Sequence, residues 1–262
     1  MSDQRDGDVL RVVAKMSDDA DWDTLVSGGA DAVHLAQFAT ASECDQLRDY
    51  ICSHPLAVEY ATAAGVTRLG SSFSDIRKTG RVAEEYRKPD VLADLVRVNG
   101  AIARLLGQIL ASWSSGIETL SYQGIRLHRV IARRIVGRSA EPHDDDIAKE
   151  LPGDPMASQV VVQLGVNLYV ETPTEGGELE GWRRRLSKEE YEAIRNPDPA
   201  KGYGVLRTGI GAPDWLLRPR KGDVVVFRNS ELHAIRPAKE GRATCGFFLG
   251  YRGREKPLLI WS

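Results

Sequence analysis

The stretch from Gln159 to Val170 constrains the fold most, because its side chains alternate between two kinds. Successive residues of a β-strand point to opposite faces, so the alternation predicts a strand whose two faces differ in chemistry. The two sets are Val162, Leu164, Val166, Leu168 and Val170 on one face, and Gln163, Gly165, Asn167 and Tyr169 on the other. A strict alternation is typical of a strand and not of a helix, so the sequence predicts at least one sheet.

The two halves of the chain differ in pattern. Thr40 and Glu43 match a capping box at the start of a helix that ends or bends at Pro55. The sequence predicts mostly loop over 60–88 and one long amphipathic helix over 90–112, where apolar residues recur with a helical period. Strands are expected mainly later: 33–38, 124–137, 159–170, 224–227 and 242–251. Helices followed by short strands predict an α+β fold with a β-sandwich core.

The composition excludes several classes of protein. Lys and Arg number 35 and Asp and Glu number 37, so a net charge of −2 gives no global field toward nucleic acid or membrane. The longest uncharged stretch, 155–170, is too short to span a bilayer, and the acidic start 1–8 does not fit a signal peptide. The three cysteines Cys44, Cys52 and Cys245 cannot all pair and are expected to be reduced thiols, as in a cytoplasm.

Two of the five histidines lie where a metal site would need them. His143 and Asp145 are two residues apart, so in a strand both point to one face and could grip one ion. His233 follows the apolar strand 224–227, which would deliver it to the interior as a third ligand. Two histidines and a carboxylate on one side of Fe(II) leave three positions open. Taken alone, the acidic run after His143 also fits a solvated turn, and a lone His233 is more often structural.

Arg242 and Thr244 lie two residues apart beyond the second histidine and share a strand face. A guanidinium binds a carboxylate through two parallel hydrogen bonds, and a hydroxyl adds one. The pair could therefore hold the far carboxylate of a dicarboxylic cosubstrate, although a surface arginine on an edge strand is the commoner case in isolation. Gln163 and Asn167 share a strand face and either line the same pocket or face solvent.

Several other residues carry weaker signals. His128 lies on a basic strand and either faces substrate or is structural. Three arginines near it either attract an anionic substrate or form a solvated face: Arg133, Arg134 and Arg138. The polar insertion over 181–220 has the length of a lid or binding loop. It begins with a basic run: Arg183, Arg184 and Arg185.

The ordered set of motifs resembles the Fe(II)/2-oxoglutarate-dependent oxygenases. His143-x-Asp145, then His233 after 90 residues, then Arg242-x-Thr244 match the pattern of that superfamily. Further segments are similar in order to the prolyl-hydroxylase-like branch: 35–48, 167–170, 176–179, 222–227 and 233–237. The ending 258–262 and the region of Trp182 resemble a smaller group that hydroxylates or halogenates free or N-modified amino acids.

The resemblance implies a role for each candidate residue. His143, Asp145 and His233 would bind Fe(II), and Arg242 would hold the C5 carboxylate of 2-oxoglutarate with Thr244 beside it. Halogenases of the family have Gly or Ala where this chain has Asp145, so the carboxylate implies hydroxylation. O2 would be the second cosubstrate, and succinate and CO2 would be released.

We therefore expect an α+β chain with a double-stranded β-helix (jelly-roll) core and N-terminal helices packed on its larger sheet. Residues 1–262 would form one oxygenase domain, with a helical part over 1–115, a core over 116–262 and the insertion at 181–220.

The expected reaction is hydroxylation of an unactivated C–H bond in a small polar molecule, first an amino acid or amino-acid derivative. Alternatives are a nucleotide, nucleoside or peptidyl substrate, another oxidative outcome such as desaturation, or a catalytically inactive jelly roll that binds a small acid. No nucleic-acid or membrane partner is expected, and the chain would be a monomer or a homodimer.

Overall fold

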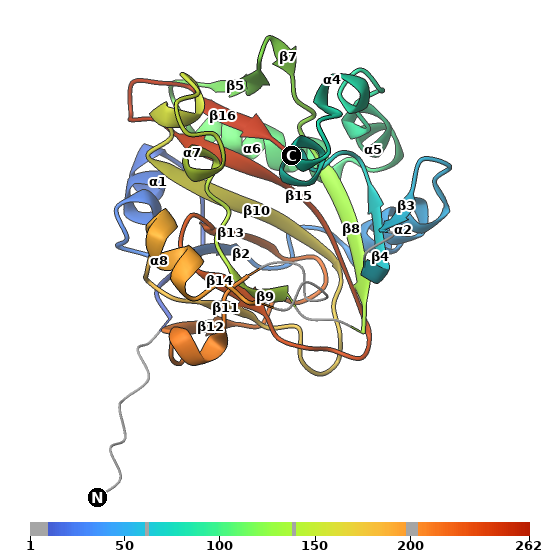
Figure 1. The fold of residues 1–262 in the computed structure, drawn as a ribbon. Coiled ribbons are helices and arrows are strands. Elements are labelled where there is room, and N and C mark those ends of the chain that lie inside the picture. The colour runs from blue at the N-terminus through green and yellow to red at the C-terminus, as the bar shows by residue number, and fades with distance from the viewer. Residues whose placement is uncertain (1–9, 61–62, 138–139, 198–203) are drawn as a thin grey trace, which may run out of the picture.

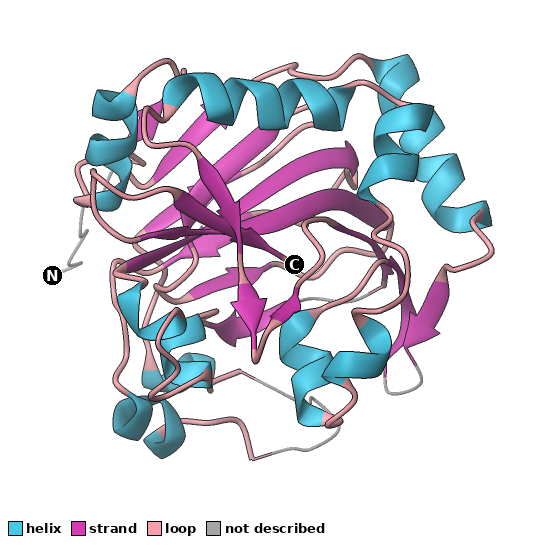
Figure 2. Ribbon diagram, turned by 90° about the horizontal axis from the view of Figure 1, so that it is seen from above, coloured by secondary structure: helices cyan, strands magenta, loops and turns pink. Residues whose placement is uncertain are grey.

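The computed structural model describes residues 10–60, 63–137, 140–197 and 204–262. Two β-sheets form the centre, and helices lie around them (Figures 1 and 2). The helices are α1 (Asp19–Val26), α2 (Ala41–Ser53), α3 (Phe73–Lys78), α4 (Val82–Glu85), α5 (Leu92–Val98), α6 (Ala101–Ser112), α7 (Ile147–Glu150) and α8 (Lys188–Ala193). The strands are β1 (Val12–Val13), β2 (Ala32–Leu35), β3 (Val58–Tyr60), β4 (Ala63–Leu69), β5 (Ile117–Thr119), β6 (Ser121–Tyr122), β7 (Ile125–Arg126), β8 (Ile131–Val136), β9 (Ala140–His143), β10 (Val162–Glu171), β11 (Leu179–Gly181), β12 (Trp215–Leu217), β13 (Val224–Arg228), β14 (His233–Ile235), β15 (Gly241–Tyr251) and β16 (Leu258–Trp261).

The large sheet is built around the strand that the alternating pattern predicted. Its order is β1-β2-β13-β10-β15-β8-β4-β3, and β16 and β5 extend it beside β15. β10 pairs antiparallel with β15 on one side and with β13 on the other, so it is fully enclosed by neighbours. The alternating stretch is therefore a central strand, and both of its faces are covered.

The two faces of β10 have different surroundings, as the alternation predicts. Leu164, Val166 and Leu168 point into the main core, where α2 packs on the sheet. Tyr169 points to the other face, where it packs with side chains of the small sheet such as Trp215. One face thus carries the apolar core, and the other faces the second sheet.

The small sheet has the order β12-β11-β14-β9 and lies beside β13 and β10 (Figure 1). Its apolar side chains Leu179, Trp215 and Ile235 pack against Val225 and Phe227 of the large sheet. Within it, β9 pairs antiparallel with β14, and His143 lies opposite His233. Two strands far apart in sequence are thereby fixed next to each other.

The prediction of mostly loop over 60–88 is wrong. β4 lies there and pairs with β8 from Val66 opposite Ile135 to Leu69 opposite Ala132, and α3 and α4 follow. Gly65 within this strand and Gly70 directly after it both have positive φ and weaken its sequence pattern. Pairing with β8, which only the tertiary fold supplies, makes the segment a strand. The part over 1–115 consequently contributes strands as well as helices to the fold.

The single long helix predicted over 90–112 is also wrong, because two helices occupy that range. α5 ends at Val98, and Asn99 takes an extended conformation with φ −153°. The Asn99 side chain accepts a hydrogen bond from the Ala101 backbone N–H at 2.9 Å and so helps to start α6. The apolar period continues across the break because both helices pack on the same core.

The helix predicted from the capping box is confirmed. The Thr40 side chain accepts from the Glu43 backbone N–H, and the Glu43 carboxylate accepts from the Thr40 backbone N–H. α2 then runs to Ser53, just before Pro55.

The cysteines are unpaired, as expected. Cys44 and Cys245 are buried and Cys52 is exposed, and burial raises the pKa of the Cys245 thiol to about 12. In the described part of the chain, no helix combines the length and apolar character needed to cross a membrane.

Thr40→Ala should lower the free energy of unfolding by about 1 kcal/mol, because the variant loses the cap of a helix that packs on the main core. The matched control is Ser187→Ala, which removes the capping box of α8, a helix without buried residues. The control should change global stability much less, as measured by urea unfolding. Equal losses in both variants would contradict a special coupling of α2 to the core.

Candidate active site

The metal-ligand candidates come together at one end of the small sheet. His143 is the last residue of β9, and His233 is the first residue of β14. Asp145 follows two residues after His143, and its backbone N–H donates to the Asn229 carbonyl at 2.8 Å. The loop after β9 is therefore tied to the loop before β14, which fixes the carboxylate beside both imidazoles.

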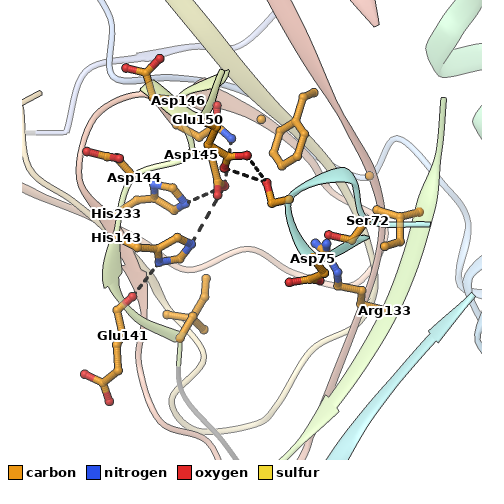
Figure 3. A pocket seen from close by; sticks show the side chains of 18 of the residues that line it. Ser72, Asp75, Arg133, Glu141, His143, Asp144, Asp145, Asp146, Glu150 and His233 are labelled. Carbon is orange, nitrogen blue, oxygen red and sulfur yellow. Dashed lines mark hydrogen bonds and ion pairs between the residues drawn. The ribbon is translucent and has the colours of Figure 1, made fainter. Parts of the chain in front are cut away.

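The three side chains point at one another (Figure 3). The Asp145 Oδ2 atom lies 3.6 Å from His233 Nε2 and 4.0 Å from His143 Nε2. The ring centroids of the two histidines are 4.3 Å apart. One donor atom from each of the three residues lies within 4.8 Å of the other two.

The backbone sets which nitrogen of each imidazole is free. His143 Nδ1 lies 2.7 Å from the Glu141 carbonyl, and His233 Nδ1 lies 3.1 Å from the Glu231 carbonyl. A carbonyl oxygen only accepts, so each Nδ1 carries the proton and donates it. Each Nε2 therefore keeps its lone pair and turns it toward the carboxylate, as metal-binding histidines do.

Burial keeps His233 uncharged. Desolvation, and then the neighbouring His143, lower the pKa of His233 to about 4. Its ring is packed edge-on against Phe227, with ring centroids 5.1 Å apart. At neutral pH the imidazole is neutral and can bind a cation through Nε2.

Only one of the three consecutive aspartates is left for a metal. Asp144 forms an ion pair with Lys149 at 2.6 Å, and Asp146 forms one with Arg185 at 2.7 Å. Asp145 has no Lys or Arg partner within the described ranges. Successive side chains after the end of β9 point to alternate sides, so the Asp145 carboxylate points away from those of Asp144 and Asp146.

Asn229 is a site residue that the sequence did not single out. Its Nδ2 donates to Asp145 Oδ2 at 3.2 Å, while its carbonyl holds the backbone of the same aspartate. Asn229 lies between the end of the buried strand β13 and His233. A polar residue at the end of a buried strand was therefore the sequence signal that could have identified it. Its two contacts orient the carboxylate, as partners of metal ligands generally do.

The ligand cluster opens into a cavity of about 1160 Å³ between the two sheets and α3. The volume exceeds that of a typical small-molecule pocket, so two ligands fit together. Figure 3 shows the cluster on one side and Ser72, Asp75 and Arg133 across from it. Residues from β8, β10 and β15 form the wall of the large sheet.

Arg242 enters this cavity from β15. Its guanidinium lies over the Tyr169 ring at 5.0 Å and donates to the Tyr169 hydroxyl at 3.3 Å. The Nε atom of Arg242 is buried and lacks a hydrogen-bond partner in the described structure. Thr244 and Asn167 also line the cavity, on neighbouring strands of the large sheet. A guanidinium whose buried Nε–H is free is a ready partner for a carboxylate.

Tyr169 was missed as a candidate, although it continues the period of two that links Gln163 and Asn167. Gln163 itself has another contact: its Oε1 accepts from the Ile147 backbone N–H at 2.8 Å. Its side chain is buried and anchors the start of α7, the helix after the ligand loop. It is not among the residues that line the cavity.

The remaining candidates lie in different places. Among them, Arg133 lines the cavity. Arg134 points to the opposite face of the sheet and pairs with Glu171 at 2.7 Å. His128 is buried, lies 3.0 Å from the Lys88 carbonyl and is outside the cavity lining. Arg138 lies outside the described residues.

The insertion contributes both ion pairs and cavity wall. Its three arginines contact carboxylates elsewhere in the chain: Arg183 with Asp31, Arg184 with Glu190 and Arg185 with Asp146. α8 brings Lys188, Tyr191 and Glu192 to the cavity rim. Burial raises the pKa of Tyr191 to about 12.

Comparison with solved structures decides the fold. The structure matches an N-substituted L-amino acid dioxygenase from Burkholderia ambifaria with a TM-score of 0.61 and 18% identity, covering 93% of this chain and 91% of that one. It matches HygX from Streptomyces hygroscopicus, solved with nickel and 2-oxoglutarate bound, with a TM-score of 0.51 and 14% identity over 87% and 84% of the two chains. The chain has the fold of the 2-oxoglutarate-dependent oxygenases.

A curated relative agrees with this oxygenase fold. L-gamma-glutamyl-L-propargylglycine hydroxylase of Streptantibioticus cattleyicolor is 28% identical over 123 residues, which cover 46% of this chain. The matched segment spans 43% of the length of that relative. No family model matches the chain.

The donor set of this oxygenase fold fits a non-haem iron. Two neutral imidazoles and one carboxylate on one side, with the other side open to a cavity, are the facial arrangement that Fe(II) oxygenases use. His143, Asp145 and His233 would hold the ion.

Asn229→Ala should weaken Fe(II) binding about 10- to 100-fold, because the carboxylate of Asp145 loses the side chain that orients it. His233→Ala should remove the stoichiometric site altogether. Anaerobic calorimetric titration with Fe(II) measures both effects. The control is His54→Ala, because His54 directly follows α2 on the far side of the large sheet. This variant should still bind one Fe(II) per chain, and loss of Fe(II) binding in it would contradict the assignment of His143, Asp145 and His233 as the ligands.

Proposed function

We propose that this protein is an Fe(II)- and 2-oxoglutarate-dependent dioxygenase that hydroxylates a C–H bond of an amino acid or amino-acid derivative. The observation that carries the proposal is that the His143, Asp145, His233 cluster lines the same cavity as Arg242, whose Nε lacks a hydrogen-bond partner among the described residues. The overall change would be RH + 2-oxoglutarate + O2 giving ROH, succinate and CO2.

The architecture supports the proposal. The two facing sheets would be the major and minor sheets of a double-stranded β-helix, and α2 would brace the major sheet from outside. Residues 1–262 would then form one oxygenase domain with the insertion at 181–220 as part of its wall.

The protein would position the reactants and keep water out. When bound, the iron supplies the activation of O2 and the oxidation of 2-oxoglutarate. Asn229 would keep the carboxylate of Asp145 in place, and the Glu141 and Glu231 carbonyls would keep both imidazoles in the ligating tautomer. The Asp145 carboxylate would fill a position where the halogenases that this chain resembles have Gly or Ala, so hydroxylation is the proposed outcome.

Arg242 would hold the C5 carboxylate of 2-oxoglutarate. Its unpartnered Nε and its contact with the Tyr169 hydroxyl leave the guanidinium edge free for two parallel bonds to a carboxylate. Thr244 and Asn167 line the same wall and would add polar contacts. With the cosubstrate held at its far end by Arg242, the rest of the cavity would be left for substrate.

The names of two relatives favour an amino-acid substrate. One acts on N-substituted L-amino acids, and the other hydroxylates a γ-glutamyl derivative of an amino acid. Both substrates are small, polar and carry a carboxylate. A cavity lined by charged side chains from both sheets, α3 and α8 fits that class.

The activity test uses iron-loaded protein with 2-oxoglutarate, O2 and a panel of N-acetyl-L-amino acids and γ-glutamyl dipeptides. Succinate should form above the substrate-free background with at least one compound, and the product should gain 16 Da. A protein that binds 2-oxoglutarate yet forms no succinate in the presence of Fe(II) would instead be a catalytically inactive binding protein.

Arg242→Ala should raise the KM for 2-oxoglutarate about 10- to 100-fold, because a buried charge-assisted pair contributes about 1.5–3 kcal/mol. Arg242→Lys should recover only part of this loss, since an ammonium cannot form the two parallel bonds. Succinate formation at varied 2-oxoglutarate is the measurement. Arg134→Ala, on the opposite face of the sheet, is the control, and an unchanged KM in Arg242→Ala would move the role to another residue.

A further inference from the structure

One face of α3 is turned to the cavity, and the other face is fixed in a core. Phe73 and Ile76 pack with a second apolar cluster beneath the helix. Residues three and four apart share a face of a helix, so Ser74, Arg77 and Lys78 project together, and all three line the cavity. The position of these polar groups is therefore set by buried packing on the other side.

Three side chains of the cavity lining carry a buried polar atom without a hydrogen-bond partner in the described structure: Asn229 Oδ1, Arg242 Nε and Arg77 Nε. The first belongs to the proposed metal centre and the second to the proposed cosubstrate site. Arg77 lies on α3, a different wall, and neither site uses it. Burying a charged donor without a partner is costly, so this group is expected to meet an anion.

A carboxylate lies close to Arg77 without pairing with it. Glu150, at the end of α7, accepts from the Ser74 hydroxyl at 2.7 and 2.9 Å and lines the same cavity. In the described ranges no Lys or Arg lies within ion-pair distance of Glu150, although Arg77 and Lys78 act on it from further away. The wall thus presents an arginine and a glutamate that are not in ion pairs, and burial raises the pKa of the Glu150 carboxyl, which a nearby ammonium or N–H donor would counteract.

Some other charged residues of the lining are paired with one another, whereas Lys78 and Lys188, like Arg77 and Glu150, are in no ion pair within the described ranges. Arg195 pairs with Glu192 at 2.5 Å, and Lys149 pairs with Asp144 at 2.6 Å, although all four also line the cavity. Arg77 and Glu150 are left open between these closed pairs. A ligand with a negative group and an N–H donor a few bonds apart would satisfy both.

We propose that Arg77 and Glu150 form the head-group site of the substrate, where Arg77 binds the α-carboxylate and Glu150 accepts from the nitrogen on the α-carbon. This inference rests on the proposed function and narrows its substrate to molecules with a free α-carboxylate. The nitrogen is an ammonium in a free amino acid and an amide N–H in an N-acylated one, and both donate to a carboxylate. Arg242 would then bind the C5 carboxylate of 2-oxoglutarate, and Arg77 would bind the α-carboxylate of the substrate on a different wall of the cavity.

The test compares the panel compound that the wild type converts fastest with its α-methyl ester. The wild type should prefer the acid by at least tenfold in kcat/KM. Arg77→Gln should lower kcat/KM for the acid about 10- to 100-fold and leave the ester nearly unchanged, so that the preference disappears. Arg77→Lys should restore part of the preference, because it restores the charge.

Two further measurements separate binding from folding and from the cosubstrate site. The KM for 2-oxoglutarate and the melting temperature should stay unchanged in Arg77→Gln. Calorimetric titration of the acid into anaerobic Fe(II)–2-oxoglutarate enzyme should show the same loss of affinity as the kinetics. The matched control is Arg81→Gln: Arg81 is exposed, precedes α4 and pairs with Glu84, so this variant should behave as the wild type.

Glu150→Gln tests the second half of the site. An amide still accepts from an amide N–H but loses the charge that an ammonium needs. The variant should therefore lose more kcat/KM on a free amino acid, which brings an ammonium to this site, than on the N-acetyl derivative of the same amino acid. Equal losses of kcat/KM on both compounds would mean that Glu150 only holds Ser74 in place and does not contact the substrate nitrogen.

The possible failures are distinguishable. An active wild type that converts acid and ester equally well, or an Arg77→Gln variant that loses both equally, would overturn the head-group site alone. A wild type that forms no succinate with any compound contradicts the proposed function itself.

Discussion

The pairing of β9 with β14 is the constraint on which the site depends. It places His143 opposite His233 on neighbouring strands, although 90 residues separate them in the chain. β14 is held in turn by β11, where Gly181 lies opposite His233 and leaves room for the Trp215 ring; a Cβ there would lie 1.9 Å from that ring. Phe227 of the large sheet packs against His233 from the other side. The imidazole is thus oriented by both sheets before any metal binds.

The large sheet serves two purposes because its faces differ. The outer face packs on α2 and supplies most of the apolar burial, whereas the inner face holds the buried Tyr169 and Thr244 and the half-buried Arg242, whose Nε atom is enclosed. A guanidinium enclosed in this way lacks the water that would otherwise satisfy its donors. The same enclosure strengthens its attraction for a carboxylate, so the cost of burial in the free protein is offset when an acid binds.

The sequence singled out His143, Asp145, His233 and Arg242, which the structure brings to one cavity, because each lies in or just after a strand whose faces can be counted in steps of two. It could not predict Asn229, Arg77 or Glu150. Their roles depend on contacts between segments that are far apart, such as the loop before β14 with the loop after β9, and α3 with α7. For the same reason Gln163, which shares a face with Asn167 by counting, turned out to hold the backbone of Ile147.

By itself the sequence determined the central strand and the α2 cap, because these follow from local periodicity and local hydrogen bonds. The tertiary structure decided that 60–88 contains β4 and α3 and that Asn99 divides α5 from α6. It also decided which of three consecutive aspartates stays free of a cation. Those outcomes depend on strand partners and ion pairs supplied by distant residues such as Lys149 and Arg185, and a local pattern carries no information about them.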